Sequence, residues 1–212
     1  MGSEMCIRDS EKDAVIAIQA ETPDMQDEIN LVWKYLLPAM RDVMPTENSA
    51  MTQNLQEKLK TLALPLPAKG DDSPAISEIS GKTFILKPSD TGIESLSIHF
   101  EEDKCRITLK EGGKEYEMNF GAGRWIEGET TRTGPNLLKG AKAHNVGLLP
   151  EKIAGCYSWK DDNTLELILR YIESPHSEKF ICKFNRNKIA VEYQPSMAFG
   201  EAQPVIAGEM ER

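Results

Sequence analysis

Residues 164–193, TLELILRYIESPHSEKFICKFNRNKIAVEY, decide the fold class of this chain. Apolar side chains recur at every second position, as Leu165, Leu167 and Leu169 do. A period of two is typical of β-strands that bury one face. The polar run Asn-Arg-Asn at 185–187 separates two such segments and is typical of a tight turn. The stretch therefore predicts consecutive antiparallel strands.

The same period continues backwards through much of the chain. Alternating runs cover residues 96–100, 105–109 and 116–120, and Gly112-Gly113 separates the last two. Short strands at a spacing of about 8–12 residues, joined by tight turns, are typical of an antiparallel meander. We count about eight or nine strands, enough for an up-and-down barrel without exposed edges. The glycine-rich insertion at 132–152 is predicted to be a loop over one barrel end.

The N-terminal part follows a different pattern. Residues 13–20, DAVIAIQA, form an almost wholly apolar run that predicts a strand buried on both faces. Thr22 and Pro23 then mark a helix start, with Thr22 as the predicted N-cap. Large apolar side chains recur after them at helical spacing: Met25, Ile29, Val32, Trp33, Leu36, Leu37 and Met40. A second helix is predicted at about residues 49–62.

Together these patterns predict a mainly β protein, an antiparallel barrel preceded by an orphan strand and one or two helices. Residues 64–75, rich in Pro, Gly and Asp, are predicted to link residues 11–63 to a barrel domain at 76–212. Residues 1–10, MGSEMCIRDS, show neither the apolar core of a signal peptide nor a strand or helix period. They resemble a translated sequencing adapter. We expect a disordered or non-native tail there, with native sequence missing upstream of Glu11.

The charge balance excludes some functions. The chain has 25 Lys and Arg against 34 Asp and Glu, and no basic run longer than two residues. It therefore lacks the positive surface that nucleic acids or anionic membranes require. No apolar stretch approaches the roughly 20 residues of a membrane span. Beyond the suspect Cys6, the three cysteines Cys105, Cys156 and Cys182 form no C-x-x-C pair and are predicted to be buried thiols. We predict no metal and no cofactor.

Two tripeptides match catalytic motifs by their letters alone. Asp90-Thr91-Gly92 matches the core of aspartic proteases, but Pro88-Ser89 precedes it instead of an apolar strand, which favours a polar turn. Arg132-Thr133-Gly134 resembles the K-T-G element of serine β-lactamases, which has chemical meaning only beside an S-x-x-K nucleophile. The sequence contains neither S-x-x-K nor Y-x-N. We therefore predict no catalytic residue in this chain.

Four aromatic residues are candidates for lining a pocket of the barrel: Trp125, Tyr157, Trp159 and Tyr171. Gly123-Arg124-Trp125 is similar to the G-x-W opening of lipocalin barrels, in which the Trp closes the barrel floor. Aromatic side chains at alternating strand positions are also ordinary core residues. Both interpretations stay open at this stage.

The lead-in carries a second resemblance. Residues 13–40, DAVIAIQAETPDMQDEINLVWKYLLPAM, resemble the end of the catalytic domain in bacterial serine hydrolases of the β-lactamase-related superfamily, which includes class C β-lactamases, D,D-peptidases and esterases. There a late core strand is followed by the C-terminal helix. Some members append a lipocalin-like β domain, and residues 154–176, AGCYSWKDDNTLELILRYIESPH, are similar to that domain.

This resemblance implies a parent enzyme that attacks an ester or amide carbonyl with a Lys-activated serine, in the periplasm or at the cell surface. The family's Ser, Lys and Tyr all lie upstream of the matching segment, so no residue here inherits a catalytic role. The barrel would be an accessory domain that docks on or gates the catalytic domain of the same polypeptide. The interdomain surface would consist of Met25, Ile29, Trp33, Leu36 and Met40.

Two alternatives stay open, a stand-alone calycin-like barrel that holds a small apolar ligand in its mouth and a structural interaction domain. One feature discriminates between them and the accessory domain. A missing partner domain predicts that Val15, Ile16, Ile18 and several residues of the helical stripe are more exposed than their type warrants. It also predicts that the strand at 13–20 is unpaired or paired only at an edge.

Overall fold

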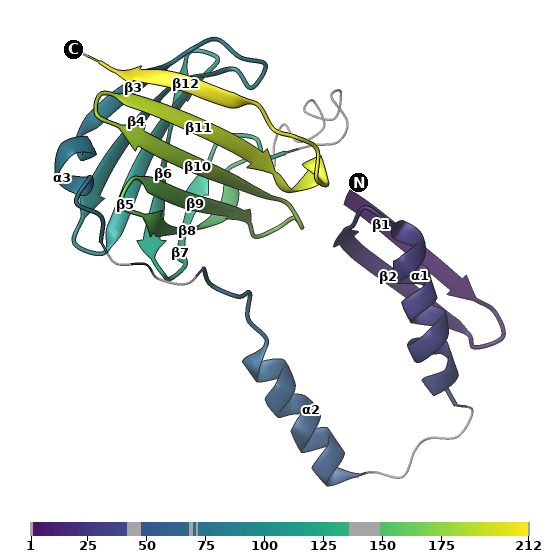
Figure 1. Ribbon diagram of the computed structural model, residues 1–212. Coiled ribbons are helices and arrows are strands. Elements are labelled where there is room, and N and C mark those ends of the chain that lie inside the picture. Colours follow the sequence, from purple (N-terminus) through teal and green to yellow (C-terminus); the bar gives the residue numbers. More distant parts are fainter. Residues whose placement is uncertain (1, 42–47, 68–69, 71, 136–148, 212) are drawn as a thin grey trace. The chain divides into compact units, whose positions relative to one another are not determined.

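The structure, a computed structural model, describes the chain except residues 1, 42–47, 68–69, 71, 136–148 and 212 (Figure 1). The chain divides into two compact units, the lead-in Ser3–Pro65 and the barrel unit Leu66–Arg212. Among the described residues, no helix is both long and apolar enough to cross a membrane.

The lead-in begins with a two-stranded sheet of β1 (Gly2–Asp9) and β2 (Ala14–Glu21). The sequence analysis expected no regular structure in residues 1–10, and here the structure differs. The Asp9 carboxylate accepts hydrogen bonds of 2.9 Å from the backbone N–H groups of Glu11 and Lys12. This cap lets the chain turn back, so that β1 pairs with β2. β2 has β1 as its partner, so the prediction of an orphan strand was wrong; pairing along a single edge was the stated alternative.

Three helical segments follow one another after β2: α1 (Met25–Leu31), a π-helical turn at Val32–Leu36 and a 3-10 turn at Leu37–Ala39. The N-cap is Asp24, whose carboxylate accepts from the Gln26 N–H at 2.9 Å, so the prediction of Thr22 as the cap was wrong. Pro38 lies within the 3-10 turn, and the helical stretch ends one residue after it, at Ala39. α2 (Ser49–Thr61) is the second predicted helix, and Asn48 caps it.

The barrel unit contains a ten-stranded sheet (Figure 1). In chain order the strands are β3 (Lys82–Leu86), β4 (Ile93–Glu101), β5 (Lys104–Glu111), β6 (Lys114–Ala122), β7 (Ile126–Thr130), β8 (Glu151–Asp161), β9 (Thr164–Tyr171), β10 (Ser177–Asn185), β11 (Lys188–Pro195) and β12 (Val205–Met210). Neighbours in the sheet are neighbours in the chain, and β12 pairs with β3. This is the predicted up-and-down meander.

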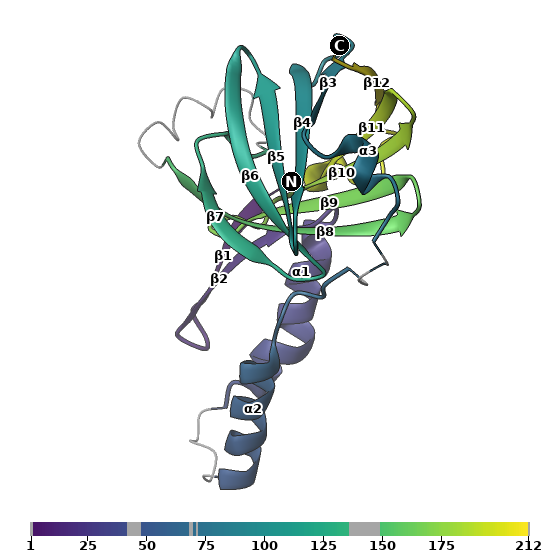
Figure 2. The same ribbon diagram turned by 90° about the vertical axis from the view of Figure 1, so that its left-hand side faces the viewer.

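A short parallel contact closes the barrel, because Gly121 and Ala122 of β6 pair with Cys156 and Tyr157 of β8. Nine strands thereby form a hydrogen-bonded ring, and β7 lies beside the first half of β8. Figure 2 shows the strands wrapping around a common interior. A Cβ on Gly155 would lie 2.2 Å from the Asn119 carbonyl oxygen, so only glycine permits this approach. The prediction of a closed, mainly β barrel is confirmed.

The interior of the barrel is apolar and packed. Side chains at every second strand position are buried, as the period of two predicts, and Leu167 is 1% exposed. Cys105, Cys156 and Cys182 are free and fully buried, which confirms the predicted buried thiols. Burial raises the pKa of the Cys182 thiol to about 12. These thiols are therefore uncharged core residues at neutral pH.

The two ends of the barrel differ. A short helix, α3 (Ile76–Ile79), closes one end with Ile79, which is 1% exposed. Beneath it lies a cluster of rings with centroid distances of 5.6–6.1 Å between its contacting pairs; it consists of Phe84, Phe100, Tyr157, Trp159 and Phe184. We call the opposite end the loop end. It carries the Gly112-Gly113 turn and the segment predicted as a loop at 132–152, of which residues 136–148 lie outside the described part.

Candidate functional site: a buried ionic network at the loop end

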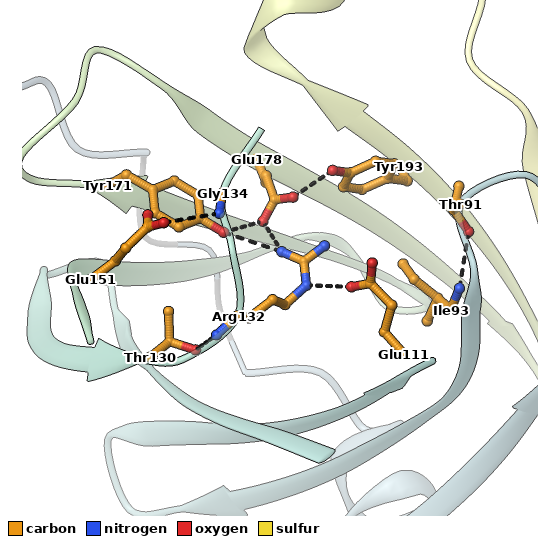
Figure 3. Close-up of polar contacts among 10 residues, drawn as sticks. All are labelled: Thr91, Ile93, Glu111, Thr130, Arg132, Gly134, Glu151, Tyr171, Glu178 and Tyr193. Atoms are coloured by element: carbon orange, nitrogen blue, oxygen red, sulfur yellow. Dashed lines mark hydrogen bonds and ion pairs between the residues drawn. The ribbon is translucent and has the colours of Figure 1, made fainter. Parts of the chain in front are cut away.

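Arg132 enters the loop end of the barrel directly after β7 (Figure 3). It is 5% exposed, and its guanidinium forms two ion pairs. Nη1 binds the carboxylate of Glu178 on β10, which is 1% exposed, and Nε lies 2.8 Å from Oε2 of Glu111 at the end of β5. Charges are buried in this way only when partners replace the lost water.

Two tyrosines complete the network. The Tyr171 hydroxyl donates to Oε2 of Glu178 at 2.8 Å and accepts from Arg132 Nη1 at 3.1 Å. The Tyr193 hydroxyl donates to the other carboxylate oxygen, Oε1. Both oxygens of Glu178 therefore have donors within the barrel, from β9, β11 and the segment after β7 (Figure 3).

Arg132, Tyr171 and Tyr193 keep their protonation states over a wide pH range. Burial acts to lower the pKa of Arg132, but the charge and hydrogen bond of Glu178, together with Tyr171 and Tyr193, outweigh burial. The pKa of Arg132 therefore lies well above its ordinary value. Burial, reinforced by the negative charge of Glu178, raises the pKa of both Tyr171 and Tyr193 far above the usual phenol value. The arginine stays charged and both tyrosines stay neutral at physiological pH.

A further carboxyl group lies beside the network. Glu151 at the start of β8 accepts a hydrogen bond from the Gly134 N–H at 3.4 Å. Burial raises the pKa of Glu151, and the charge of Glu178 acts in the same direction. Gly134 is itself constrained, because an added Cβ would lie 2.9 Å from the Tyr171 ring. Arg132-Thr133-Gly134 is thus a structural element that fits against Tyr171.

A pocket of about 260 Å³ opens in front of the network. Its lining is polar and of mixed charge: Glu111, Gly112, Lys114, Tyr116, Arg132 and Thr133. The lining offers hydrogen-bond donors and acceptors. Across the part of the chain that the structure describes, no three His, Cys, Asp or Glu side chains converge on a possible metal site.

The aromatic residues singled out from the sequence separate in space. Tyr171 belongs to the ionic network at the loop end, whereas Tyr157 and Trp159 lie in the ring cluster near α3 and are core residues. Trp125 lies between β6 and β7 and is half-buried. Asp90-Thr91-Gly92 forms the expected turn, in which the Ile93 N–H donates to the Thr91 hydroxyl at 3.3 Å and Gly92 has a φ of 74°.

The sequence pattern predicts Arg132 at the start of a loop, and Glu178 is not among the predicted site residues. One signal was available. Glu178 has the same parity as Phe180 and Cys182 on β10, so its side chain points into the barrel. A carboxylate at an inward position needs a buried cation, and Arg132, directly after a strand, was a candidate for it.

No protein-family model and no curated protein matches this chain. Solved structures match in fold. A fatty-acid-binding protein from brain tissue of Drosophila melanogaster has 13% identity and a TM-score of 0.42, with 62% of this chain and 98% of that chain covered. The Schistosoma mansoni fatty-acid-binding protein in complex with arachidonic acid has 8% identity and a TM-score of 0.45, with 65% of this chain and 99% of that chain covered. Lipid binding protein 8 of Caenorhabditis elegans has 12% identity and a TM-score of 0.41, with 64% of this chain and 96% of that chain covered. The likeness concerns the calycin-type barrel fold alone.

Proposed function

We propose that this chain is a non-catalytic binding protein whose barrel holds a small polar ligand at the loop end. The observation that carries the proposal is the pocket of about 260 Å³ beside the ionic network. Pockets with a few convergent polar groups next to residues of shifted pKa are the usual places of ligand binding.

The pocket limits the size and polarity of the ligand. Its volume lies slightly below the range of about 300–1,000 Å³ typical of sites for drug-sized molecules. Glu111, Lys114 and Arg132 place charges of both signs around it. The sequence analysis considered an apolar ligand for a barrel of this kind. The lining favours instead a small molecule that carries both donors and acceptors.

The network would act on the ligand by fixing the pocket wall. Arg132 has partners in Glu178, Glu111 and Tyr171, so an anionic ligand would have to displace a buried carboxylate to reach it. Glu111 is different, because its side chain is 28% exposed while Arg132 Nε holds one of its oxygens. Such a pre-oriented carboxylate binds without first losing side-chain entropy. We assign direct ligand contact to Glu111, Tyr116, Lys114 and Thr133.

A screen of small polar fragments against the ¹⁵N-labelled chain tests this proposal. Binding fragments are expected to shift the amide resonances of Gly112, Gly113 and Thr133. Glu111→Gln and Tyr116→Phe should weaken these shifts, whereas Lys152→Gln, which removes an exposed ion pair elsewhere on the barrel, should not. Fragments that bind equally well to the Glu111 and Tyr116 variants would place the site elsewhere, and a screen without any shift at the loop end would refute the proposal.

A second function is favoured by one observation on the lead-in. On its helical stripe Trp33 is 54% exposed and Leu36 is exposed as well, and on β2 Val15 is 69% exposed. Ile16, Ile18, Met25, Ile29 and Met40 are half-buried, and Val32 is buried. Contiguous exposed apolar residues mark interaction surfaces. We therefore keep the proposal of an accessory domain that docks on a partner domain, which the resemblance identifies as a β-lactamase-related catalytic domain at the cell surface or in the periplasm.

Trp33→Glu tests the docking proposal. A charge in the exposed stripe should reduce the binding of a hydrophobic dye and any self-association of the chain. The unfolding midpoint of the barrel should stay unchanged, since Trp33 lies outside the barrel unit. Unaltered dye binding in Trp33→Glu, with Lys34→Glu as the matched control on the same turn, would contradict a role of the stripe.

A further inference from the structure

A second hollow lies on the outer face of the barrel, across β10, β11, β12 and β3, which lie side by side in the sheet (Figure 1). Its volume is about 360 Å³. The side chains that line it from the outward strand positions are Lys87, Lys183, Lys188, Ala190, Ala207 and Glu209. None of them lines the pocket in front of Arg132.

The strand register explains the hollow. Lys183 lies opposite Ala190, and Ala190 lies opposite Ala207. The Lys87 N–H donates to the Ala207 carbonyl at 2.8 Å, so the next residue in the same row is Lys87. The row therefore reads Lys-Ala-Ala-Lys across four strands. Because adjacent strands lie about 4.8 Å apart, the two lysine backbones are separated by about 14 Å, with only methyl groups between them.

Outward alternation makes this row accessible. The inward neighbours Phe184, Ile189 and Leu86 are buried, whereas Lys183, Ala207 and Lys87 are exposed. Ile85 and Val205, which are also on outward positions, expose 49% and 62% of their surface. The alanines form a flat apolar floor, and the lysine side chains are long enough to reach over it from both sides.

The charges at this hollow are unbalanced. Several basic side chains elsewhere on the outer surface pair with carboxylates, as Lys104 does with Glu101 and Lys110 with Glu94. Within the described part of the chain, Lys87, Lys183 and Lys188 have no carboxylate oxygen within 4 Å, although Glu209 lies opposite Lys188. Three cations and one acid therefore line the hollow, in a chain whose net charge is −9. The charge of Lys183 also acts on Asp161, although the two side chains form no ion pair within 4 Å.

We propose that this outer hollow is a binding site for a small amphiphilic anion. Its apolar body would lie on Ala190 and Ala207, and its anionic groups would face Lys87 and Lys183 on either side. A mainly positive rim around an apolar floor attracts anionic ligands and stabilises them by contact as well as by charge. The volume is that of a small-molecule site, which favours a compact ligand over an extended acidic peptide.

Naphthalene-1,5-disulfonate is a suitable probe, because it joins a flat apolar body to anionic groups on both sides. Titrated into the ¹⁵N-labelled full chain, it is expected to shift the amide resonances of Ala190 and Ala207 in a saturable way that weakens with added salt. Sulfate represents the charge alone and 1-naphthol the apolar body alone. Both should bind there at least tenfold more weakly than the disulfonate.

Two exposed lysines and one floor residue provide the variants. Lys87→Gln and Lys183→Gln are each expected to weaken the disulfonate about three- to fivefold, the upper range for an exposed ion pair. Ala207→Leu should fill the hollow and abolish the shifts. Lys104→Gln replaces a lysine on β5 whose side chain is 32% exposed, and it should change nothing. Lys87, Lys183 and Ala207 are all exposed, so the three variants should keep the fold.

Several results would overturn the proposal. Unchanged affinity in both lysine variants would mean that charge plays no part. If sulfate bound as tightly as the disulfonate, the alanine floor would not contribute to binding. If 1-naphthol bound as tightly, the lysine rim would not contribute. A poly-glutamate peptide that shifts the same resonances at lower concentration than the disulfonate would assign the face to an acidic protein segment instead.

Discussion

Apolar side chains in the barrel and in the lead-in have opposite surroundings, although both segments show a regular hydrophobic period. On β9, Leu165, Leu167 and Leu169 are at most 1% exposed. On α2, Met51, Leu55 and Leu59 form a helical stripe and are 57–70% exposed. Closure of the sheet gives every inward residue of the barrel neighbours from other strands. A single amphipathic helix has one apolar face, which it can bury only against another element.

The difference teaches that hydrophobic periodicity predicts the type of an element but not the partner of its apolar face. In the barrel the partner is the same sheet, because the ring closes through β6 and β8. In the lead-in, β2 pairs with β1 and the helical stripe stays partly exposed. The barrel should therefore respond to substitutions as a cooperative core, and the lead-in as an interaction surface.

The largest effect is expected from the ionic network. Glu178→Ala leaves the buried Arg132 charge without its main partner and removes the acceptor of two tyrosine hydroxyls. We expect the free energy of unfolding of the barrel to fall by about 3–5 kcal/mol. Chemical denaturation followed by far-UV circular dichroism measures it.

A double variant sharpens this test. In Arg132→Met/Glu178→Leu both charges are removed together, so much of the lost stability should return. A loss of less than 1 kcal/mol in Glu178→Ala would indicate that Arg132 finds enough compensation in Glu111 alone.

A matched pair of leucine substitutions compares the two regions directly. Leu167→Ala opens a cavity in the barrel core and should cost about 2–5 kcal/mol of unfolding free energy. Leu59→Ala on α2 removes the same atoms from a side chain that is 57% exposed and should change the barrel by no more than about 0.5 kcal/mol. Similar losses in both variants would mean that α2 contributes to the stability of the barrel and that the contrast between the regions fails.

The smallest effect is expected at Glu151. Burial raises the pKa of this carboxyl in the folded chain above its ordinary value of 4.5, so the folded state holds the proton to a higher pH than the unfolded state. Stability therefore falls as the pH rises from the unfolded to the folded pKa, and the loss persists above it. Glu151→Gln should remove this fall and stabilise the barrel slightly at pH 7. Unfolding midpoints at pH 4 and pH 7 measure it, and a larger pH dependence in Glu151→Gln than in the original chain would contradict the assignment.

The sequence by itself determined β4, β5, β6, β9, β10 and β11 of the barrel and the two helices of the lead-in. Strand burial follows from a local rule, because successive side chains point to opposite faces whatever the partner strand is. The turn at Gly112-Gly113 and the helix end near Pro38 follow from backbone preferences of single residues. β1 escaped prediction because its residues show no period, and its pairing depends on the Asp9 turn.

Only the tertiary structure decided the closure of the ring and the network at the loop end. Arg132 meets Glu111, Tyr171 and Glu178, which come from three different strands. These side chains come together only because the sheet curls until β6 pairs with β8. The curvature of the sheet cannot be predicted from a local sequence pattern. The same holds for the outer row of Lys87, Ala207, Ala190 and Lys183, which exists only because the register aligns four separate strands. The local sequence pattern determines which face each side chain occupies, whereas long-range strand pairing determines which residues lie beside it.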